Sequence, residues 1–311
     1  MARLHVEGWA PDYGSPIDTD DSLERTVDET VEVSGSWEPI PGADDGAAEV
    51  VFVDGVRRVD ARLTLDEPTG LVSGLCGSLA VGAVTWERET PRSQVTSSVV
   101  QRLAVFGDGR GQPVPVAGPE LIYRTESIPE TDPGMLIQHF HGRMRKAEAE
   151  LSEELAKTGA FVIADGPIND LSATEKVGYI KSHRVGYLSP EKAPIIGRLR
   201  AGQRTPLFLI GATGAYPRYS WYLRLADIAG GHSWTGIVRA EVSSHLDLPT
   251  AQRIADRATA LLPKFSAPMH VDSRAPQNLV PIAALERELR RLLGDPEFVY
   301  RRLRAAVGAA A

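Results

Sequence analysis

Hydrophobic residues form two short uninterrupted runs in this chain, and an Asp-Gly pair follows each run. The first strand is expected from Glu49 to Val53, is apolar from Val50 onward and leads into Asp54-Gly55. The second run extends from Phe161 to Ala164 and leads into Asp165-Gly166. Continuous rather than alternating hydrophobicity is typical of central strands that are covered on both faces. The pattern therefore predicts two buried strands, each of which ends in an aspartate.

Between these strands, an amphipathic pattern predicts a helix from Met135 to Lys157. Apolar residues recur every three or four positions and form one stripe along it, namely Leu136, Phe140, Met144, Ala147, Leu151 and Leu155. Glu148 and Glu154 both border this stripe, whereas Glu153 is expected to point to solvent. Periodicity alone thus leaves two candidates for an acid that reaches inward.

The remaining patterns predict how the two buried strands are arranged. The segments ARLTL and LAVGAVTW predict two further strands that form a meander with the first, and GDGRGQPVPVAGP predicts a loop without the Lys-Ser or Lys-Thr of a phosphate-binding loop. Because a helix intervenes, the second buried strand can lie parallel to the first. Asp54 and Asp165 would then lie side by side at the sheet edge where ligands bind in α/β folds.

Composition indicates a globular chain with an uneven distribution of charge. The 311 residues are 42% hydrophobic and 24% charged, which suffices for a sizeable core. Residues 1–47 are polar and turn-rich, which predicts an irregular arm with acids at Asp18, Asp20, Asp21, Glu24, Asp28, Glu29 and Glu32. No apolar run of membrane-spanning length occurs, and the N-terminal segment lacks the order of a signal peptide. We therefore expect a cytoplasmic protein without a membrane partner.

The overall charge argues against a protein that coats DNA without help. The formal net charge is −7, and nonspecific DNA affinity comes largely from basic side chains that neutralise phosphates. Arginines gather near the end of the chain, at Arg287, Arg290, Arg291, Arg301, Arg302 and Arg304. Such a run can contact phosphates, an acidic partner or the acidic arm, although a solvated helix surface is the commonest outcome.

Cysteine and histidine offer little chemistry. Cys76 is the single cysteine, so there is no intramolecular disulfide, and its strand-like context favours a small buried hydrophobe. His139 and His141 are two positions apart on the predicted helix, so they point in different directions and cannot hold one metal ion together.

Three acidic residues remain as candidates for catalysis: Asp54, Asp165 and one glutamate of the helix. Mg²⁺ and Mn²⁺ prefer carboxylate and water oxygens. Two such ions about 4 Å apart can activate a water and stabilise the leaving oxygen of a phosphodiester. The alternative is that each Asp-Gly is simply a turn after a strand.

At this point the order of elements resembles the RNase H-like fold, and the motifs resemble those of the NurA nuclease family. The matching pieces are VFVDGVRR, RMRKAEAELSEEL, FVIADGPI, VGYIKSH and VRAEV, in the family's order between about residues 48 and 245. The resemblance implies an α/β fold with an RNase H-like mixed sheet flanked by helices and extra strands, as a single domain over 48–311 with C-terminal helices. It also implies that Asp54, Glu148 and Asp165 are metal ligands, and so selects Glu148 over Glu154.

The resemblance further implies an activity and partners. It implies a Mn²⁺- or Mg²⁺-dependent DNA nuclease with two metal ions, which forms a two-fold dimer and processes DNA ends in double-strand break repair with a HerA-type hexameric ATPase. Lys181 in GYIKSH is expected near the site, where it can neutralise a phosphate oxygen. The family often carries a histidine near the metal on a late helix, and this chain has SRAPQNLVPIAALERELRRLLG there. Asp272, Gln277 or Asn278 can occupy that place, and only Asp272 would be a comparable metal ligand.

Two other functions stay open on the sequence. One is a phosphotransferase of the actin and sugar-kinase type, for which a second phosphate loop is missing, and the other is a non-catalytic adaptor of a DNA-translocating ATPase. Tyr222, Arg239 and Glu241 can border a substrate groove, but an ion pair within one strand is the simpler expectation for Arg239 and Glu241.

Overall fold

The computed structural model of the chain describes residues 26–68, 70–168, 172–183, 186–211 and 216–310. These residues form two compact units. Unit 1 comprises residues 26–52, 85–94 and 152–283, and unit 2 comprises residues 53–84, 95–151 and 284–310. The acids predicted at Asp18, Asp20, Asp21 and Glu24 lie outside the described residues, and the described part of the arm contains two short strands.

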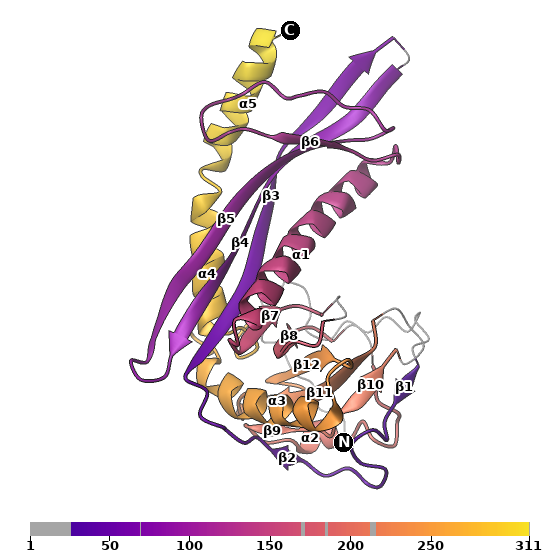
Figure 1. Cartoon of the computed structure of the whole chain (residues 1–311), viewed down its shortest axis with the longest axis vertical. Coiled ribbons are helices and arrows are strands. Elements are labelled where there is room, and N and C mark those ends of the chain that lie inside the picture. Colours follow the sequence, from indigo (N-terminus) through magenta and orange to yellow (C-terminus); the bar gives the residue numbers. More distant parts are fainter. Residues whose placement is uncertain (1–25, 69, 169–171, 184–185, 212–215, 311) are drawn as a thin grey trace. The chain divides into compact units, whose positions relative to one another are not determined.

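Strands β1 to β6 come before the first helix, α1, and helices end the chain (Figure 1). Unit 1 contains β1 (Val27–Asp28), β2 (Ile40–Pro41), β7 (Val162–Asp165), β8 (Lys176–Ile180), α2 (Ile195–Arg198), β9 (Gln203–Arg204), β10 (Phe208–Ile210), β11 (Arg218–Arg224), β12 (Ile237–Ser243), α3 (Leu248–Leu261) and the 3-10 helix η2 (Leu262–Phe265). Unit 2 contains β6 (Arg124–Ser127) and α5 (Pro296–Ala310). Elements with residues in both units are β3 (Glu49–Glu67), β4 (Gly70–Glu87), β5 (Arg92–Phe106), α1 (Pro133–Lys157) and α4 (Val280–Leu292).

The strands form one mixed sheet. In unit 1 the order is β1-β10-β11-β12-β8-β7, followed by the start of β3, and in unit 2 the order is β3-β4-β5-β6. β7 and β8 are parallel, as are β5 and β6, whereas β8, β12, β11 and β10 are antiparallel neighbours in turn. The predicted fold class, an α/β protein with a mixed sheet flanked by helices, is confirmed. None of the described helices combines the length and apolar character that a membrane span requires.

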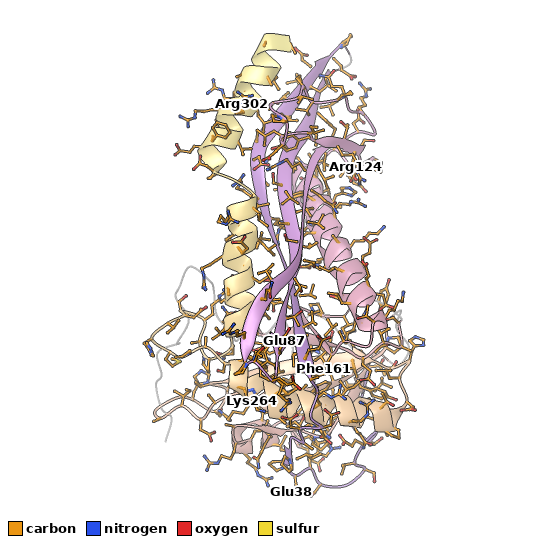
Figure 2. The ribbon with its side chains drawn as sticks, turned by 60° about the vertical axis from the view of Figure 1, so that its left-hand side comes forward. Glu38, Glu87, Arg124, Phe161, Lys264 and Arg302 are labelled. Atoms are coloured by element: carbon orange, nitrogen blue, oxygen red, sulfur yellow. The ribbon has the colours of Figure 1, made fainter. Side chains whose placement is uncertain are left out.

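In unit 2 the helices cover both faces of the strands (Figure 1). The predicted stripe of α1 is confirmed, because Leu136, Phe140 and Met144 are buried in one cluster with leucines and valines of β4 and β5. On the other face, Val299 and Leu303 of α5 pack in a second cluster. Figure 2 labels Arg302 on α5, whose Nε donates to the carbonyl of Ala117 at 2.6 Å in the predicted loop.

Cys76 lies in β4 within that second cluster, which confirms it as a small buried residue. Burial, with the negative charge of Asp60 nearby, raises the pKa of its thiol to about 12. A thiol with so high a pKa is protonated at neutral pH and is a poor nucleophile. Cys76 therefore contributes to packing alone.

In unit 1 buried charges hold the N-terminal segment against the sheet. The guanidinium of Arg204 is almost fully buried and donates to Glu32 at 2.9 Å and to Asp256 at 2.7 Å. Breaking such a buried pair costs several kcal/mol because it leaves one charge uncompensated. Glu32, one of the acids of the predicted arm, is thus part of the folded core.

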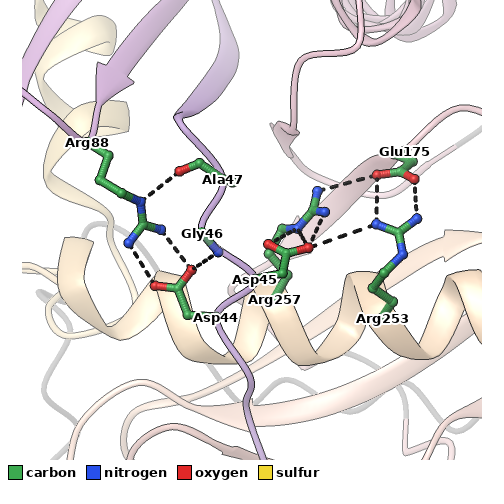
Figure 3. A network of polar contacts seen from close by, with 8 residues as sticks. All are labelled: Asp44, Asp45, Gly46, Ala47, Arg88, Glu175, Arg253 and Arg257. Carbon is green, nitrogen blue, oxygen red and sulfur yellow. Dashed lines mark hydrogen bonds and ion pairs between the residues drawn. The ribbon is translucent and has the colours of Figure 1, made fainter.

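A polar network also fixes the segment that leads into β3 (Figure 3). Asp44 accepts from both terminal nitrogens of Arg88 at 3.0 and 2.7 Å, and Asp45 accepts from Arg257 of α3 at 2.7 Å. Gly42 packs so closely on α3 that a Cβ there would lie 2.4 Å from the backbone nitrogen of Ala260. The entry of the chain into β3 is therefore tied to α3 within unit 1.

The prediction that the first buried strand ends at Asp54-Gly55 is wrong. β3 continues without interruption to Glu67 and includes ARLTL, which was expected to be a separate strand. Tight hairpin turns place the glycine of an Asp-Gly pair at a positive φ. Gly55 does not take a positive φ, whereas Gly166 has a φ of 117° and follows the end of β7. The same dipeptide thus extends one strand and follows the end of the other.

The buried stripe of α1 generates a test of the packing in unit 2. Replacing Phe140, which is fully buried, by alanine is expected to lower the free energy of unfolding by about 3–5 kcal/mol, because it leaves a cavity. Urea unfolding followed by circular dichroism measures this loss. Gln138→Ala, at an exposed position of the same helix, is the control and should change stability by less than about 0.5 kcal/mol. A loss below that level in Phe140→Ala would contradict the packing.

Candidate functional site

Asp54 lies within β3, in the part of the strand that belongs to unit 2. It is buried, with 6% of its surface exposed, and one of its oxygens accepts from the backbone nitrogen of Gly55 at 2.8 Å. The neighbours Val53 and Val56 are buried hydrophobic residues. A carboxylate in such a setting is costly unless positive charge or donors compensate it. Asp54 is therefore a position where a cation would be favoured.

Glu148 of α1 lies against the backbone beside Asp54. A Cβ placed on Gly55 would lie 2.6 Å from Oε1 of Glu148 and 3.0 Å from its carboxyl carbon. Only glycine leaves room for a carboxylate at this distance from a strand. The carboxylate of Glu148, which the family resemblance predicts to be a metal ligand, therefore lies next to Gly55, the residue that follows Asp54.

Glu286 of α4 is an acid that the sequence reasoning missed. Asp54 and Glu286, both in unit 2, each offer a carboxylate oxygen, and these oxygens lie within 4.8 Å of one another. Glu286 follows the buried Leu285 and is half-buried at the edge of the apolar stripe of α4. The same position at a stripe's edge marked Glu148, so this signal was present in the sequence. The search for a replacement of the family's histidine considered Asp272, Gln277 and Asn278 instead.

Arg57 brings positive charge to the same part of unit 2. Burial and the neighbouring charge of Arg145 lower the pKa of its guanidinium, whereas the negative charge of Glu148 opposes this shift. Its Nη1 also contacts the sulfur of Met144 at 3.9 Å. Arg57 therefore balances part of the negative charge of Glu148.

In unit 1 a chain of hydrogen bonds runs from Asp165 to Asp272. Asp165 is at the end of β7, and Lys181, just after β8, donates to it at 2.6 Å. The same ammonium donates to Oδ1 of Asn278 at 3.0 Å, and Nδ2 of Asn278 donates to Asp272 at 2.6 Å. Lys181 is thus placed beside Asp165, as expected from the sequence, and Asp272 is connected to both through Asn278.

The charge state of Asp272 follows from these contacts. Burial opposes ionisation, but hydrogen bonds from the backbone of Arg274 and from Asn278, together with the charges of Arg274 and Lys181, lower the pKa of its carboxyl. One oxygen of Asp272 accepts from Arg274 at 2.7 Å and the other from Asn278. Asp272 is therefore ionised at neutral pH and has protein donors on both oxygens.

Tyr222 lies away from any groove. It is 1% exposed and its ring packs between Phe208, at 5.8 Å, and Trp234, at 5.6 Å, between centroids. The idea that Tyr222 borders a substrate groove is therefore wrong, because β11 is covered on that face. The expected ion pair of Arg239 and Glu241 within β12 is confirmed.

Glu153 shows a second difference from the expectation. It does not point to solvent, since it accepts from the buried ammonium of Lys176 at 2.8 Å and from Thr174 at 2.9 Å. Periodicity could not identify this contact, because Lys176 approaches from another element. Glu154, the alternative to Glu148, is exposed.

The two histidines of α1 lie in separate surroundings, as expected. Nε2 of His139 lies 2.9 Å from the carboxylate of Glu126. Burial and the charges of Arg57 and Arg145 lower the pKa of His141. These two residues do not converge on one ion.

The carboxylates gathered in unit 2 suit a hard divalent cation. Asp54, Glu148 and Glu286 offer carboxylate oxygen, which Mg²⁺ and Mn²⁺ prefer over nitrogen or sulfur. Close carboxylates repel one another unless a cation or a proton lies between them. The residues therefore fit a magnesium or manganese ion.

Comparisons with known proteins find solved structures that match this chain at low sequence identity. No family model matches, and no curated protein shows significant similarity. Among solved structures, the NurA nuclease from Sulfolobus solfataricus has 12% identity and a TM-score of 0.41, over 83% of this chain and 86% of that one. The catalytic domain of human Endonuclease V has 16% identity and a TM-score of 0.31, over 80% and 85%. The first bears the name of the family that the sequence motifs resemble.

The contact between Gly55 and Glu148 generates a test that needs no metal. Gly55→Ala is expected to lower the free energy of unfolding by up to about 1 kcal/mol, because the added methyl group displaces the carboxylate at the end of the flexible Glu148 side chain. The double variant Gly55→Ala with Glu148→Ala should recover most of this loss, since it removes the carboxylate that the added methyl group would contact. A double-mutant cycle by chemical unfolding measures the coupling. Additive effects would show that the two residues do not touch.

Proposed function

We propose that this protein is a divalent-metal-dependent deoxyribonuclease. The observation that carries the proposal is the gathering of carboxylates around Gly55 in unit 2, where Asp54 and Glu286 offer oxygens within 4.8 Å and Glu148 lies against the same glycine. Asp165, on the strand predicted to run beside β3, completes the set. A hydrolase that cleaves phosphodiesters uses such carboxylates to hold its metal ions.

The course of β3 supports the inclusion of Asp165. Within unit 1 the backbone nitrogen of Val51 donates to the carbonyl of Phe161 at 2.9 Å, at the start of β3 and just before β7. Asp54 follows Val51 by three residues and Asp165 follows Phe161 by four. If the two strands are parallel, as the sequence predicts, Asp54 lies about 10 Å beyond Val51 and Asp165 about 13 Å beyond Phe161, in the same direction. Asp54, Asp165 and Glu286 are then the acids proposed to share an ion.

The proposed ions are Mn²⁺ or Mg²⁺, with two ions for full activity. When bound, they would supply an activated water and stabilise the leaving oxygen of the phosphodiester. The chain itself holds its carboxylates in place, with Gly55 admitting Glu148 and β3 orienting Asp54.

Lys181 is proposed to steady the phosphate of the substrate. Its ammonium lies 2.6 Å from Asp165 and its side chain is 10% exposed, so it provides a positive charge beside the proposed metal ligands. Asn278 and Asp272 hold that ammonium in position. Asp272 is proposed as a further ligand, which requires one of its oxygens to exchange its hydrogen bond from Arg274 or Asn278 for the ion.

The proposed substrate is DNA, and the proposed partner is a HerA-type hexameric ATPase in DNA end processing and repair. The net charge of −7 supports a partner that supplies affinity for DNA, because the 41 acidic side chains of the chain outnumber its 34 lysines and arginines. The motifs that resemble the NurA family support the choice of this partner and of a two-fold dimer.

The nuclease proposal is tested by cleavage of single- and double-stranded DNA with Mn²⁺. Asp54→Ala and Asp165→Ala are each expected to lower the rate by roughly a hundredfold or more, because each removes a proposed ligand. Glu148→Ala should also lower it, and Glu154→Ala is the matched control on the same helix, since Glu154 is exposed. Equal rates in the wild type and both aspartate variants would refute the proposal and leave the adaptor function.

The role of Glu286 is tested by metal binding alone. Glu286→Gln keeps the shape of the side chain but removes its charge, so Mn²⁺ should bind about tenfold more weakly by calorimetry. Glu288→Gln is the control on the same helix, because Glu288 pairs with Arg291 at 2.6 Å on the surface. If both variants bind Mn²⁺ as the wild type does, Glu286 is not a ligand.

A further inference from the structure

One side of α1 carries the proposed metal ligand Glu148 and two basic residues. Glu148, Arg145 and His141 are spaced by three and four positions, so they form one line along the surface of the helix. At the rise of an α-helix, Arg145 lies about 4.5 Å and His141 about 10.5 Å from Glu148 along the helix axis. All three residues belong to unit 2. A line of basic groups therefore begins beside the carboxylate that lies against Gly55.

Arg57 of β3 reaches the same part of the helix. Gly55 and Arg57 are two residues apart in an extended strand, so their side-chain positions lie on the same face of it. The position of Gly55 faces the carboxylate of Glu148, and Nη1 of Arg57 lies 3.9 Å from the sulfur of Met144, about one turn before Glu148. β3 and α1 thus run in opposite directions here, and Arg57 meets the helix where its basic residues are.

The three basic side chains are close enough to affect one another's ionisation. Burial and then the charge of Arg145 lower the pKa of Arg57, although the charge of Glu148 opposes this shift. Burial and then the charges of Arg57 and Arg145 lower the pKa of His141. Because like charges repel, this arrangement is unfavourable until an anion lies between them. Two guanidinium groups and one carboxylate leave this surface with a net positive charge.

Arg145 and His141 differ from the other basic residues of α1. Acidic partners are present for each of the others, namely Glu126 for His139 and Arg143, Glu150 for Lys146 and Glu153 for Lys157. Arg145 is exposed and His141 is half-buried, and neither side chain forms a hydrogen bond or an ion pair with a described residue. Both are therefore open to an anion from outside the chain.

We propose that Arg57, Arg145 and His141 form a subsite for the phosphodiester backbone of a nucleic acid strand, next to the phosphate that is cleaved. The inference rests on the proposed nuclease function, and it adds the course of the strand, which leaves the metal ligands along α1 from Glu148 toward His141. A guanidinium presents a planar fork that matches two phosphate oxygens, and a neutral imidazole donates one further hydrogen bond. Contacts to phosphates carry no base information, so this subsite binds without sequence preference.

Removal of one charge tests the subsite without metal and without cleavage. In EDTA at low salt, Arg145→Gln is expected to weaken binding of a fluorescent single-stranded oligonucleotide about tenfold by anisotropy, and Arg57→Gln to a similar extent. Each should also reduce the slope of log affinity against log salt by about 0.7, the value for one phosphate contact on a single strand. Lys146→Gln is the matched control, because it removes the same charge from an exposed position of the same helix whose ammonium lies 3.7 Å from Glu150.

Three results would overturn the subsite. These are a wild type that does not bind the oligonucleotide, affinities of Arg145→Gln and Arg57→Gln that equal that of the wild type, and an equal loss in Lys146→Gln. An oligonucleotide with uncharged methylphosphonate linkages should bind the wild type and Arg145→Gln equally, and a difference that persists there would show that bases, not phosphates, are contacted.

A purely structural role of Arg145 predicts a different outcome in unfolding. Because Arg57 and Arg145 repel each other in the free protein, Arg145→Gln should leave the midpoint of urea unfolding unchanged or raise it, whereas a structural role would lower it. Failure of the nuclease proposal remains distinguishable. An oligonucleotide that binds through Arg57 and Arg145 but is not cleaved with Mn²⁺ would refute the nuclease and leave the subsite in place.

Discussion

The close approach of Glu148 to Gly55 is the contact on which the candidate site depends. β3 is an uninterrupted strand through Asp54 and Gly55, and the missing Cβ of Gly55 lets a carboxylate of α1 lie against the strand. The helix is held there by its buried stripe, in particular Phe140 and Met144. Packing of an apolar face thus places a charged group beside Asp54, where propensity alone would not put one.

Concentrating negative charge in this way has an energetic cost that the chain offsets locally. Lys181 lies beside Asp165 in unit 1, and Arg57 lies near Glu148 in unit 2. Among the described residues, neither Lys181 nor Arg57 brings a histidine or a thiol close to the proposed metal ligands. Oxygen donors are what a hard cation requires, and this chemistry, more than the fold, supports the proposed hydrolysis.

The candidate site was predicted in part, for identifiable reasons. Asp54 and Asp165 were predicted because they follow buried apolar runs, whereas Glu148 was chosen over Glu154 by the family resemblance, since both border the apolar stripe of the helix. Glu286 was missed although it has the same position at a stripe's edge, because the search followed the family's histidine. The partner of Glu153 could not be predicted either, since Lys176 is distant in the sequence and meets it only through the packing of β8. Contacts between elements carry no signal in a single sequence.

The sequence by itself determined the features that depend on local pattern. These are the helix α1, the buried apolar runs of β3 and β7, and the burial of Cys76. The spacing of apolar residues follows the repeat of a helix or a strand, so it is enough to predict these features. Only the tertiary structure decided that Asp54-Gly55 lies within a strand while Asp165-Gly166 follows the end of one. The dipeptide permits both conformations, and neighbouring strands and the carboxylate of Glu148 select between them.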